Sequence, residues 1–246
     1  MSASRTRIAS VAAIIVALAT LTLGTTSAGA ASSPGTPPPG TSKVWVTHGL
    51  PLDDAGTVVD VYVDGALTVE DFAFGKTVGP LTLPAATYDI DVKLANTDTV
   101  AIDQDVTVPA GGNFSVVASY TSAEGAVGLN VFSNDVSPVP WFTGRLAMHH
   151  AAAAPAVDVD LGLFPLSRWF PALKFTPVTG AVNGQQAVQP AFSFLSYTAD
   201  VRVSGTTNTV LSLDDVRLKD RGVTNVYVVG SAAAGTLQTV SSVITP

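Results

Sequence analysis

Apolar and polar residues alternate along most of the chain after residue 43, and this period of two predicts β-strands. In the run TYDIDVKL at 87–94, every second residue is Tyr, Ile, Val or Leu, and the others are Thr, Asp or Lys. The run VDVYVDG at 59–65 alternates in the same way and ends in Asp64-Gly65, a pair typical of a hairpin turn. Strands with one apolar face, separated by Gly and Pro at intervals of roughly ten residues, predict antiparallel sandwiches.

The strand pattern occurs twice. Tyr88-x-x-Asp91-Val92-Lys93 returns as Tyr197-x-x-Asp200-Val201-Arg202, and Val59-Asp60-Val61 returns as Val157-Asp158-Val159. Such a repeat predicts a duplicated structural unit. We therefore expect an all-β fold with two tandem antiparallel β-sandwich domains of immunoglobulin or transthyretin type.

The spacing of the repeats sets the expected domain boundaries. The first sandwich is expected at 43–133 and the second at 144–246, joined by a linker at 134–143 in which Pro138 and Pro140 oppose strand pairing. The second copy has extra residues between its VDV strand and its Tyr, so an inserted loop is expected at 162–190. Long loops on rigid sandwiches often carry function.

The N-terminus has the pattern of an export signal. Arg5 and Arg7 precede a weakly polar to apolar run at 8–23, and Ala28-Gly29-Ala30 forms a cleavage site of small residues. We expect a signal peptide at 1–30, with an uncleaved anchor as the alternative, and a Pro/Gly/Ser-rich spacer at 31–42. The protein is thus expected to be secreted, extracellular or cell-wall associated, with no membrane insertion after cleavage.

Composition narrows the choice of partner. The net charge is −7 and the chain has no Cys, so an exported form depends on packing without disulfide bonds. Binding to phosphate backbones needs clustered positive charge, which makes nucleic acid an unsuitable partner. The sequence alone does not indicate whether the protein is a monomer or an oligomer.

Several motifs in the first repeat resemble those of the bacterial domain of unknown function 4397. They are Val44-Trp-Val-Thr-His48, Val59-Asp60-Val61-Tyr62-Val63-Asp64-Gly65, Phe72-Ala-Phe74-Gly75 and Leu83-Pro84-Ala-Ala-Thr87-Tyr88. The second copy keeps His149, Asp158 and Tyr197 and lacks the Leu-Pro-Ala turn, so it is similar to a diverged copy of the same domain. The resemblance implies an exported or surface β domain with no assigned reaction.

Three histidines are the candidates for catalytic or metal chemistry. His48 and His149 are expected at equivalent strand ends, and His150 follows directly. Imidazole can act as a base or a metal ligand, but a metal site needs three or four converging ligands. No HExxH or nucleophile-elbow motif accompanies them. We favour rings that satisfy backbone groups of the adjoining loops, and we expect no metal and no cofactor.

Aspartates form loose pairs at 53–54, 103 with 105, 158 with 160, and 214–215. Loop carboxylates can bind calcium outside the cell, but none of these pairs has the spacing of a known calcium loop. We interpret Asp60 and Asp158 as residues that face outward or bond to turns.

Aromatic residues gather around the expected insertion: Trp141, Phe142, Phe164, Trp169, Phe170 and Phe175. Exposed aromatic side chains could stack on sugar rings or bind a protein partner. The alternative, which we favour here, is that they fill the interface between the copies or cover the second core. If they bind a ligand, Trp169, Phe170, Phe164 and Phe175 are the expected contacts.

The sequence favours an exported, non-enzymatic surface module that binds a cell-wall glycan or a surface protein. A structural spacer without a ligand is the first alternative. The second is a metal-dependent hydrolase that uses His48 or the pair His149 and His150.

Overall fold

The computed structural model describes residues 40–51 and 58–245. The expected signal peptide at 1–30, most of the expected spacer at 31–42 and the pair at 53–54 lie outside these residues. Within the described ranges, no helix has the length and apolar character needed to cross a membrane.

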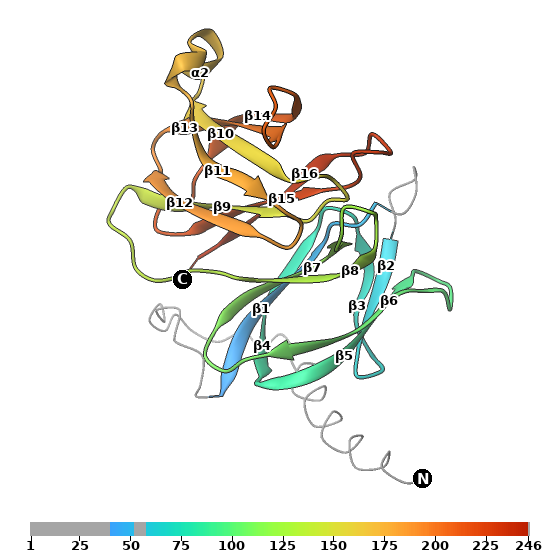
Figure 1. Cartoon of the computed structure of the whole chain (residues 1–246). Coiled ribbons are helices and arrows are strands. Elements are labelled where there is room, and N and C mark those ends of the chain that lie inside the picture. The colour runs from blue at the N-terminus through green and yellow to red at the C-terminus, as the bar shows by residue number, and fades with distance from the viewer. Residues whose placement is uncertain (1–39, 52–57, 246) are drawn as a thin grey trace. The chain divides into compact units, whose positions relative to one another are not determined.

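The first half of the described chain forms two four-stranded sheets. One has the strand order β4-β1-β7-β8 and the other β3-β2-β5-β6. The strands are β1 (Thr41–His48), β2 (Val58–Val63), β3 (Ala66–Ala73), β4 (Thr77–Pro84), β5 (Ala86–Leu94), β6 (Val100–Val108), β7 (Asn113–Tyr120) and β8 (Val127–Ser133). Val44 and Val116 of one sheet meet Val61 and Val92 of the other in a shared core, which makes this unit a sandwich (Figure 1).

The second half repeats this arrangement strand for strand. Its sheets have the orders β12-β9-β15-β16 and β11-β10-β13-β14. The strands are β9 (Thr143–His150), β10 (Val157–Leu163), β11 (Phe175–Ala181), β12 (Gln186–Phe192), β13 (Ser196–Val203), β14 (Thr209–Arg217), β15 (Val223–Val229) and β16 (Gln238–Ile244). The prediction of an all-β fold with two tandem sandwiches is confirmed.

The pairing differs from the expected antiparallel sandwich in one respect. β1 pairs with β7 in parallel, and β9 pairs with β15 in the same way. A parallel pair needs a long crossover, and the strands between β1 and β7 provide it. The period of two could not reveal this, because side chains alternate in both kinds of pair.

The repeat seen in the sequence is also a repeat of strand register. Asp60 lies opposite Lys93 between β2 and β5, and Asp158 lies opposite Arg202 between β10 and β13. Tyr88 lies opposite Val106, as Tyr197 lies opposite Val216. Equivalent positions in the two sandwiches can therefore be compared residue by residue.

A buried cluster joins side chains of both sandwiches. Val117 and Phe132 of the first pack with Ala151, Tyr227, Val229 and Val240 of the second. The imidazole of His149 stacks on the ring of Tyr227, with 4.5 Å between ring centroids, and contacts Phe132 at the same centroid distance. Asn225 Nδ2 donates to Asn134 Oδ1 at 3.2 Å. Residues of β7, β8 and β15 that point away from their own sandwich core are therefore buried against the other sandwich. This explains why β15 is buried along its whole length.

Candidate functional site

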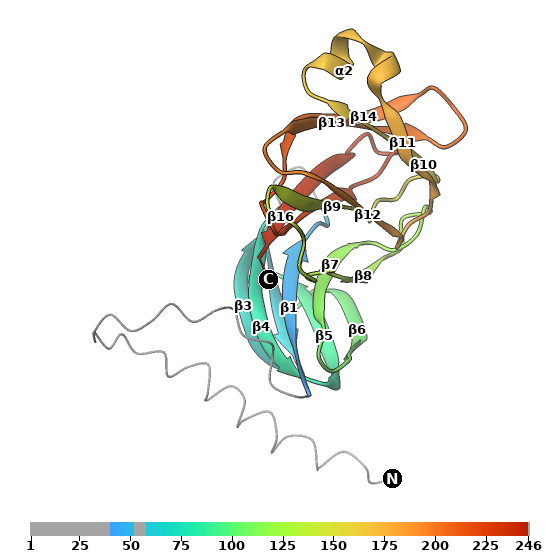
Figure 2. The ribbon, with the colours of Figure 1, turned by 90° about the vertical axis from the view of Figure 1, so that its left-hand side faces the viewer.

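The two sandwiches differ in the connection between their second and third strands. In the first, Asp64 and Gly65 alone join β2 to β3, and both have a positive φ, as expected for a two-residue hairpin turn. In the second, residues 164–174 join β10 to β11 and contain α2 (Leu166–Trp169) and the 3-10 turn η1 (Pro171–Leu173). We call residues 164–174 the tip segment. Figure 2 shows α2 projecting beyond the neighbouring strands β10, β11, β13 and β14.

The tip segment is the part of 162–190 that has no counterpart in the first sandwich. The rest of that range contains β11 and β12, which take the sheet positions of β3 and β4. The added residues are therefore concentrated at one connection, next to the strand ends of a single sheet.

Charged side chains of the tip segment point back toward the sheet. Arg168 Nη1 donates to both carboxylate oxygens of Asp200 at 2.7 and 2.9 Å, and its Nε donates to Asp214 at 2.6 Å. Lys174 Nζ donates to the same Asp200 carboxylate. The Asp200 side chain is only 6% exposed, so one buried carboxylate holds the segment at two positions, Arg168 and Lys174.

The pKa values of these groups reflect the ion pairs. Burial by itself would raise the pKa of Asp200, but hydrogen bonds from Lys174 and Arg168 outweigh burial and keep that pKa below its usual range. Burial would likewise lower the pKa of Arg168, and the carboxylates of Asp200 and Asp214 raise it instead. Asp200 and Arg168 are therefore both charged at neutral pH.

The middle of the tip segment is held by a neutral contact. Ser167 is fully buried, and its Oγ lies 2.8 Å from Thr198 Oγ1 on β13. A Cβ at Gly162 would collide with the Ser167 side chain, so the close approach requires glycine at that position. Ser167, Arg168 and Lys174 together fix the segment on the strands below it.

Apolar side chains of the same region point into solvent. Trp169 is 72% exposed and Phe170 is 58% exposed. Other apolar residues with large exposed fractions flank them: Leu163, Leu166, Leu173 and Phe175. A loop that only covered a core would turn these residues inward and its charges outward. The tip segment does the reverse and presents a fixed apolar surface to water, as binding surfaces do.

The expectation that the aromatic group fills the interface between the copies or covers the second core is wrong. Trp169, Phe170 and Phe175 are exposed, and Phe164 is half-buried. Trp141 and Phe142 are also exposed, at the start of β9 in the other sheet, where they join Phe192 and Phe194. The sequence grouped six aromatic residues by proximity along the chain, and the fold divides them between two surfaces.

The histidines require a second correction, because the expected equivalence of His48 and His149 is wrong. His48 Nδ1 accepts from the Leu50 amide at 3.4 Å, and His150 Nδ1 accepts from the Ala152 amide at the same distance. His48 and His150 are therefore the equivalent pair, and His149 lies one residue earlier. Adjacent histidines made the alignment ambiguous by one position.

All three imidazoles are buried. His150 Nε2 also lies 3.1 Å from the Pro155 carbonyl oxygen, and burial lowers its pKa. His149 Nε2 lies 3.2 Å from Asn225 Oδ1, and burial lowers its pKa to about 4. His48 packs against Phe72 and Phe74. All three rings are thus enclosed by the packing of the strands and their loops.

The remaining family-motif residues form hydrogen bonds to backbone groups. Asp60 Oδ1 accepts from the Asp71 amide at 2.9 Å, and Asp158 Oδ1 accepts from the Gly180 amide at 2.8 Å. Each tyrosine of the repeat donates its hydroxyl to a carbonyl at 2.9 Å: Tyr88 to Pro84 and Tyr197 to Phe192. These contacts connect strands and turns within each sandwich.

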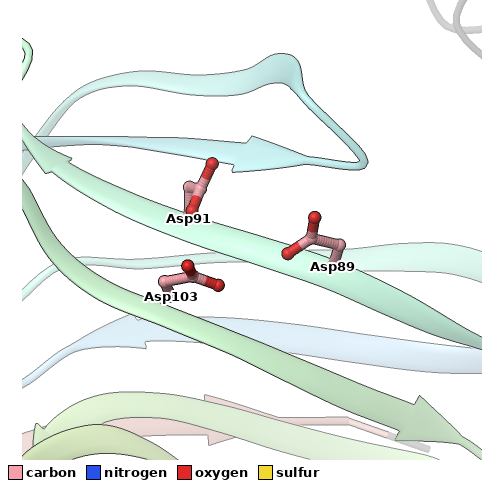
Figure 3. A group of neighbouring side chains, drawn as sticks. All are labelled: Asp89, Asp91 and Asp103. Carbon is pink, nitrogen blue, oxygen red and sulfur yellow. The ribbon is translucent and has the colours of Figure 1, made fainter.

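An acidic cluster on the first sandwich was not expected from the loose aspartate pairs. Asp89, Asp91 and Asp103 have carboxylate oxygens within 4.8 Å of one another (Figure 3). Register explains this, because the Asp-x-Asp at 89–91 lies directly opposite the Asp-x-Asp at 103–105. Partial loss of solvent, followed by repulsion from the other carboxylates, raises the pKa of Asp89. Exposed acidic groups often occur without an ion, and we assign no site to them.

Among models of known protein families, one matches part of this chain. The model of the domain of unknown function DUF4397 matches residues 42–160, which include the first sandwich from the second residue of β1, all of β9 and the first part of β10. No curated protein matches the chain.

Among solved structures, the Bacillus anthracis TIE protein is 12% identical, with a TM-score of 0.21, and the match covers 78% of this chain. A leucine-rich repeat protein of Bacteroides thetaiotaomicron is 14% identical over 78% of this chain, with a TM-score of 0.19. The chain spans only 34% and 26% of those two proteins. A Bacteroides uniformis protein provisionally named for cell adhesion is 13% identical, with a TM-score of 0.21. That match covers 83% of this chain and 97% of the other protein.

Proposed function

We propose that the chain is an exported, non-enzymatic surface module that binds a protein partner through the tip segment. One observation carries the proposal: the charges of the segment are paired inward on Asp200 and Asp214, and its aromatic and leucine side chains are left in water. Holding a loop in its bound conformation lowers the entropic cost of association.

The chemistry of the tip segment favours a protein over a glycan at this position. Trp169 and Phe170 lie between leucines, and the nearest cations are already paired with carboxylates. A sugar needs hydrogen-bonding side chains beside the ring on which it stacks, whereas an apolar cleft in a protein does not. Buried aromatic anchors are typical of the residues that dominate protein–protein binding.

Several observations support a non-enzymatic role and an exported location. The histidines that a hydrolase would use are buried in the packing of the strands. The N-terminal residues have the sequence of a signal peptide, and residues 42–160 match a domain family without an assigned reaction. We infer that the second sandwich is a diverged copy of that domain, because its strand order and registers repeat those of the first.

The test is binding of the labelled protein to intact cells of the producing strain. We expect saturable binding by the wild-type chain, and at least about tenfold weaker binding by the variant Trp169→Ser/Phe170→Ser. Leu67→Ser is the matched control, because Leu67 is an exposed leucine beside the two-residue turn of the first sandwich. Protease treatment of the cells should abolish the part of the binding that Trp169→Ser/Phe170→Ser also loses.

Two results would overturn the proposal. Equal binding by the wild type and the double variant would show that the tip segment is not the contact. Binding that survives protease treatment and is lost in the double variant would assign the tip segment to a partner other than a protein.

A further inference from the structure

Four exposed aromatic side chains and an arginine gather at one end of the second sandwich. Phe194 contacts Phe142 edge to face, with 6.4 Å between ring centroids, and lies 5.3 Å from the Phe192 ring. The guanidinium of Arg221 lies 3.7 Å from the centroid of the Trp141 ring. We call these five residues the end cluster: Trp141, Phe142, Phe192, Phe194 and Arg221.

The first sandwich has the same backbone at this end without the side chains. The Arg221 amide donates to the Thr143 carbonyl at 2.8 Å, and the Gly111 amide donates to Thr41 at the same distance. The Ser193 amide donates to the Phe142 carbonyl at 2.8 Å, as the Ala85 amide donates to Gly40 at 2.7 Å. Phe142 and Arg221 therefore occupy the positions that Gly40 and Gly111 occupy in the first copy.

Both positions need a left-handed backbone. The φ angles are 86° at Gly40 and 75° at Gly111, and they are 61° at Phe142 and 53° at Arg221. Glycine adopts this conformation without strain, whereas a residue with a Cβ loses roughly 1–2 kcal/mol there. Bulky residues with positive φ are uncommon and cluster at functional sites.

Packing does not explain why the second copy accepts this strain. Phe142 is 63% exposed and Phe194 is 66% exposed, so burial offsets little of the cost. Phe192 replaces Pro84 of the first sandwich, since the repeat tyrosines donate to Phe192 and Pro84. Phe194 lies in the connection that follows, which is one residue longer in the second copy. The second copy has thus replaced three small or rigid residues with larger ones on one exposed surface.

Hydrogen-bonding groups lie beside the rings of the end cluster, in contrast to the tip segment. Asp220 accepts from Ser193 Oγ at 3.0 Å and lies 3.9 Å from Arg221, and both charged residues are exposed. Arg221 holds the Trp141 ring from one side by a cation–π contact, and Trp141 still keeps 67% of its surface exposed. Oriented aromatic rings next to exposed carboxylate and guanidinium groups suit a ligand with apolar and hydroxylated faces.

We propose that the end cluster is a glycan-binding site, separate from the tip segment. The C–H face of a pyranose ring would stack on the aromatic rings, and its hydroxyl groups would exchange hydrogen bonds with Asp220 and Arg221. A protein partner fits this surface less well, because interface centres are depleted in aspartate. The site belongs to the second sandwich alone, since the positions of the first that are equivalent to Phe142, Phe192 and Arg221 are Gly40, Pro84 and Gly111.

The internal repeat supplies the test variant. Phe142→Gly/Arg221→Gly restores the residues of the first sandwich at two positions where glycine is unstrained, so we expect this variant to fold. The wild type and the variant are applied to an array of purified bacterial and host polysaccharides and to protease-treated cell walls. We expect at least about tenfold weaker binding by the variant on every glycan that the wild type binds.

Trp169→Ser/Phe170→Ser separates this proposal from the previous one. It removes the two exposed aromatic side chains of the tip segment and leaves the end cluster intact, so glycan binding should persist while binding to a protein on untreated cells is lost. No binding of the wild type to any polysaccharide would overturn the glycan site. So would equal binding by the Phe142→Gly/Arg221→Gly variant and the wild type, with thermal unfolding showing that both are folded.

Discussion

Replacing Asp200 with Asn tests whether a single buried carboxylate holds the tip segment in place. The substitution keeps the size of the side chain and removes the charge that Arg168 and Lys174 share. The NH₂ group of the new Asn would also face Arg168 and Lys174, which are themselves donors and cannot accept a hydrogen bond from it. The side chain of Asp200 also bonds to Ser212 on β14, and the oxygen of an Asn side chain can still accept that hydrogen bond.

The expected magnitude follows from these contacts. A hydrogen bond to a charged group contributes about 1.5–3 kcal/mol, and breaking a fully buried ion pair costs about 3–5 kcal/mol. Arg168 keeps Asp214 and the Leu213 carbonyl, and the side chains of Arg168 and Lys174 are 25% and 20% exposed. Water can therefore offset part of the loss, and we expect a decrease of about 2–4 kcal/mol in the free energy of unfolding.

The repeat provides the control, because Asp91 occupies the same strand position in the first sandwich. Asp91 has Asp89 and Asp103 for neighbours where Asp200 has two cations, so Asp91→Asn should leave stability unchanged or raise it. Urea unfolding measures both free energies. Hydrogen exchange should quicken at residues 164–174 in Asp200→Asn alone. Equal stability of the two variants, or unchanged exchange in the tip segment, would refute the anchoring role of Asp200.

The pH dependence of this contact has a definite sign. The folded-state pKa of Asp200 lies below its ordinary value, so its stabilising contribution is complete above the unfolded pKa of about 3.9. The contribution is lost as the pH falls through the folded pKa. The difference between wild type and Asp200→Asn should therefore be constant near neutral pH and shrink in acid.

Four further predictions follow from the site and the packing. Phe142→Gly should be about 0.5–1 kcal/mol more stable in urea unfolding than Phe142→Ala, since both lose the ring, only Ala keeps the strain of positive φ, and the larger entropy that Gly loses on folding offsets part of that difference; equal stability would remove the strain argument. Asp89→Asn should raise the melting temperature at low salt, where opposed carboxylates repel one another, and the gain should fade in about 1 M salt. Gly162→Ala should lower stability, because its Cβ meets Ser167, and a variant with Ser167→Gly added should recover part of the loss. His149 has a folded pKa of about 4 against an ordinary 6.5, so the wild type should lose about 3 kcal/mol as the pH falls from 6.5 to 4, and His149→Gln should show a flatter profile.

The repeat and the strands could be predicted because local patterns encode them. Tyr88 and Tyr197 recur with the same neighbours, and the alternation around them specifies one buried face whatever the partner strand is. Asp64-Gly65 predicted a two-residue hairpin for a local reason as well, since its turn needs two residues with positive φ. Each of these features depends on a few consecutive residues.

What could not be predicted depends on contacts between distant residues. The direction of Trp169 is set by the pairing of Arg168 with Asp200, thirty-two residues away, and no pattern within the tip segment reveals that partner. The meeting of Asp91 with Asp103 required the register of β5 on β6. The equivalence of His48 and His150 required the hydrogen bonds of their rings, because two adjacent histidines fit the repeat almost equally well.

Differences between the two copies are the most informative signal for function in this chain. Where the copies agree, as at Asp60 and Asp158 or at the tyrosines, the shared residue bonds to a turn or a carbonyl and maintains the sandwich. Where they differ, the second copy places aromatic side chains in water, at the tip segment and at the end cluster. A duplicated domain keeps one scaffold under a common packing requirement and is free to change surfaces that packing does not constrain. Phe142 is strained where the equivalent Gly40 of the first copy is not, which shows such a change at a single backbone position. Ligand binding should therefore be sought first at the end cluster, which contains Phe142.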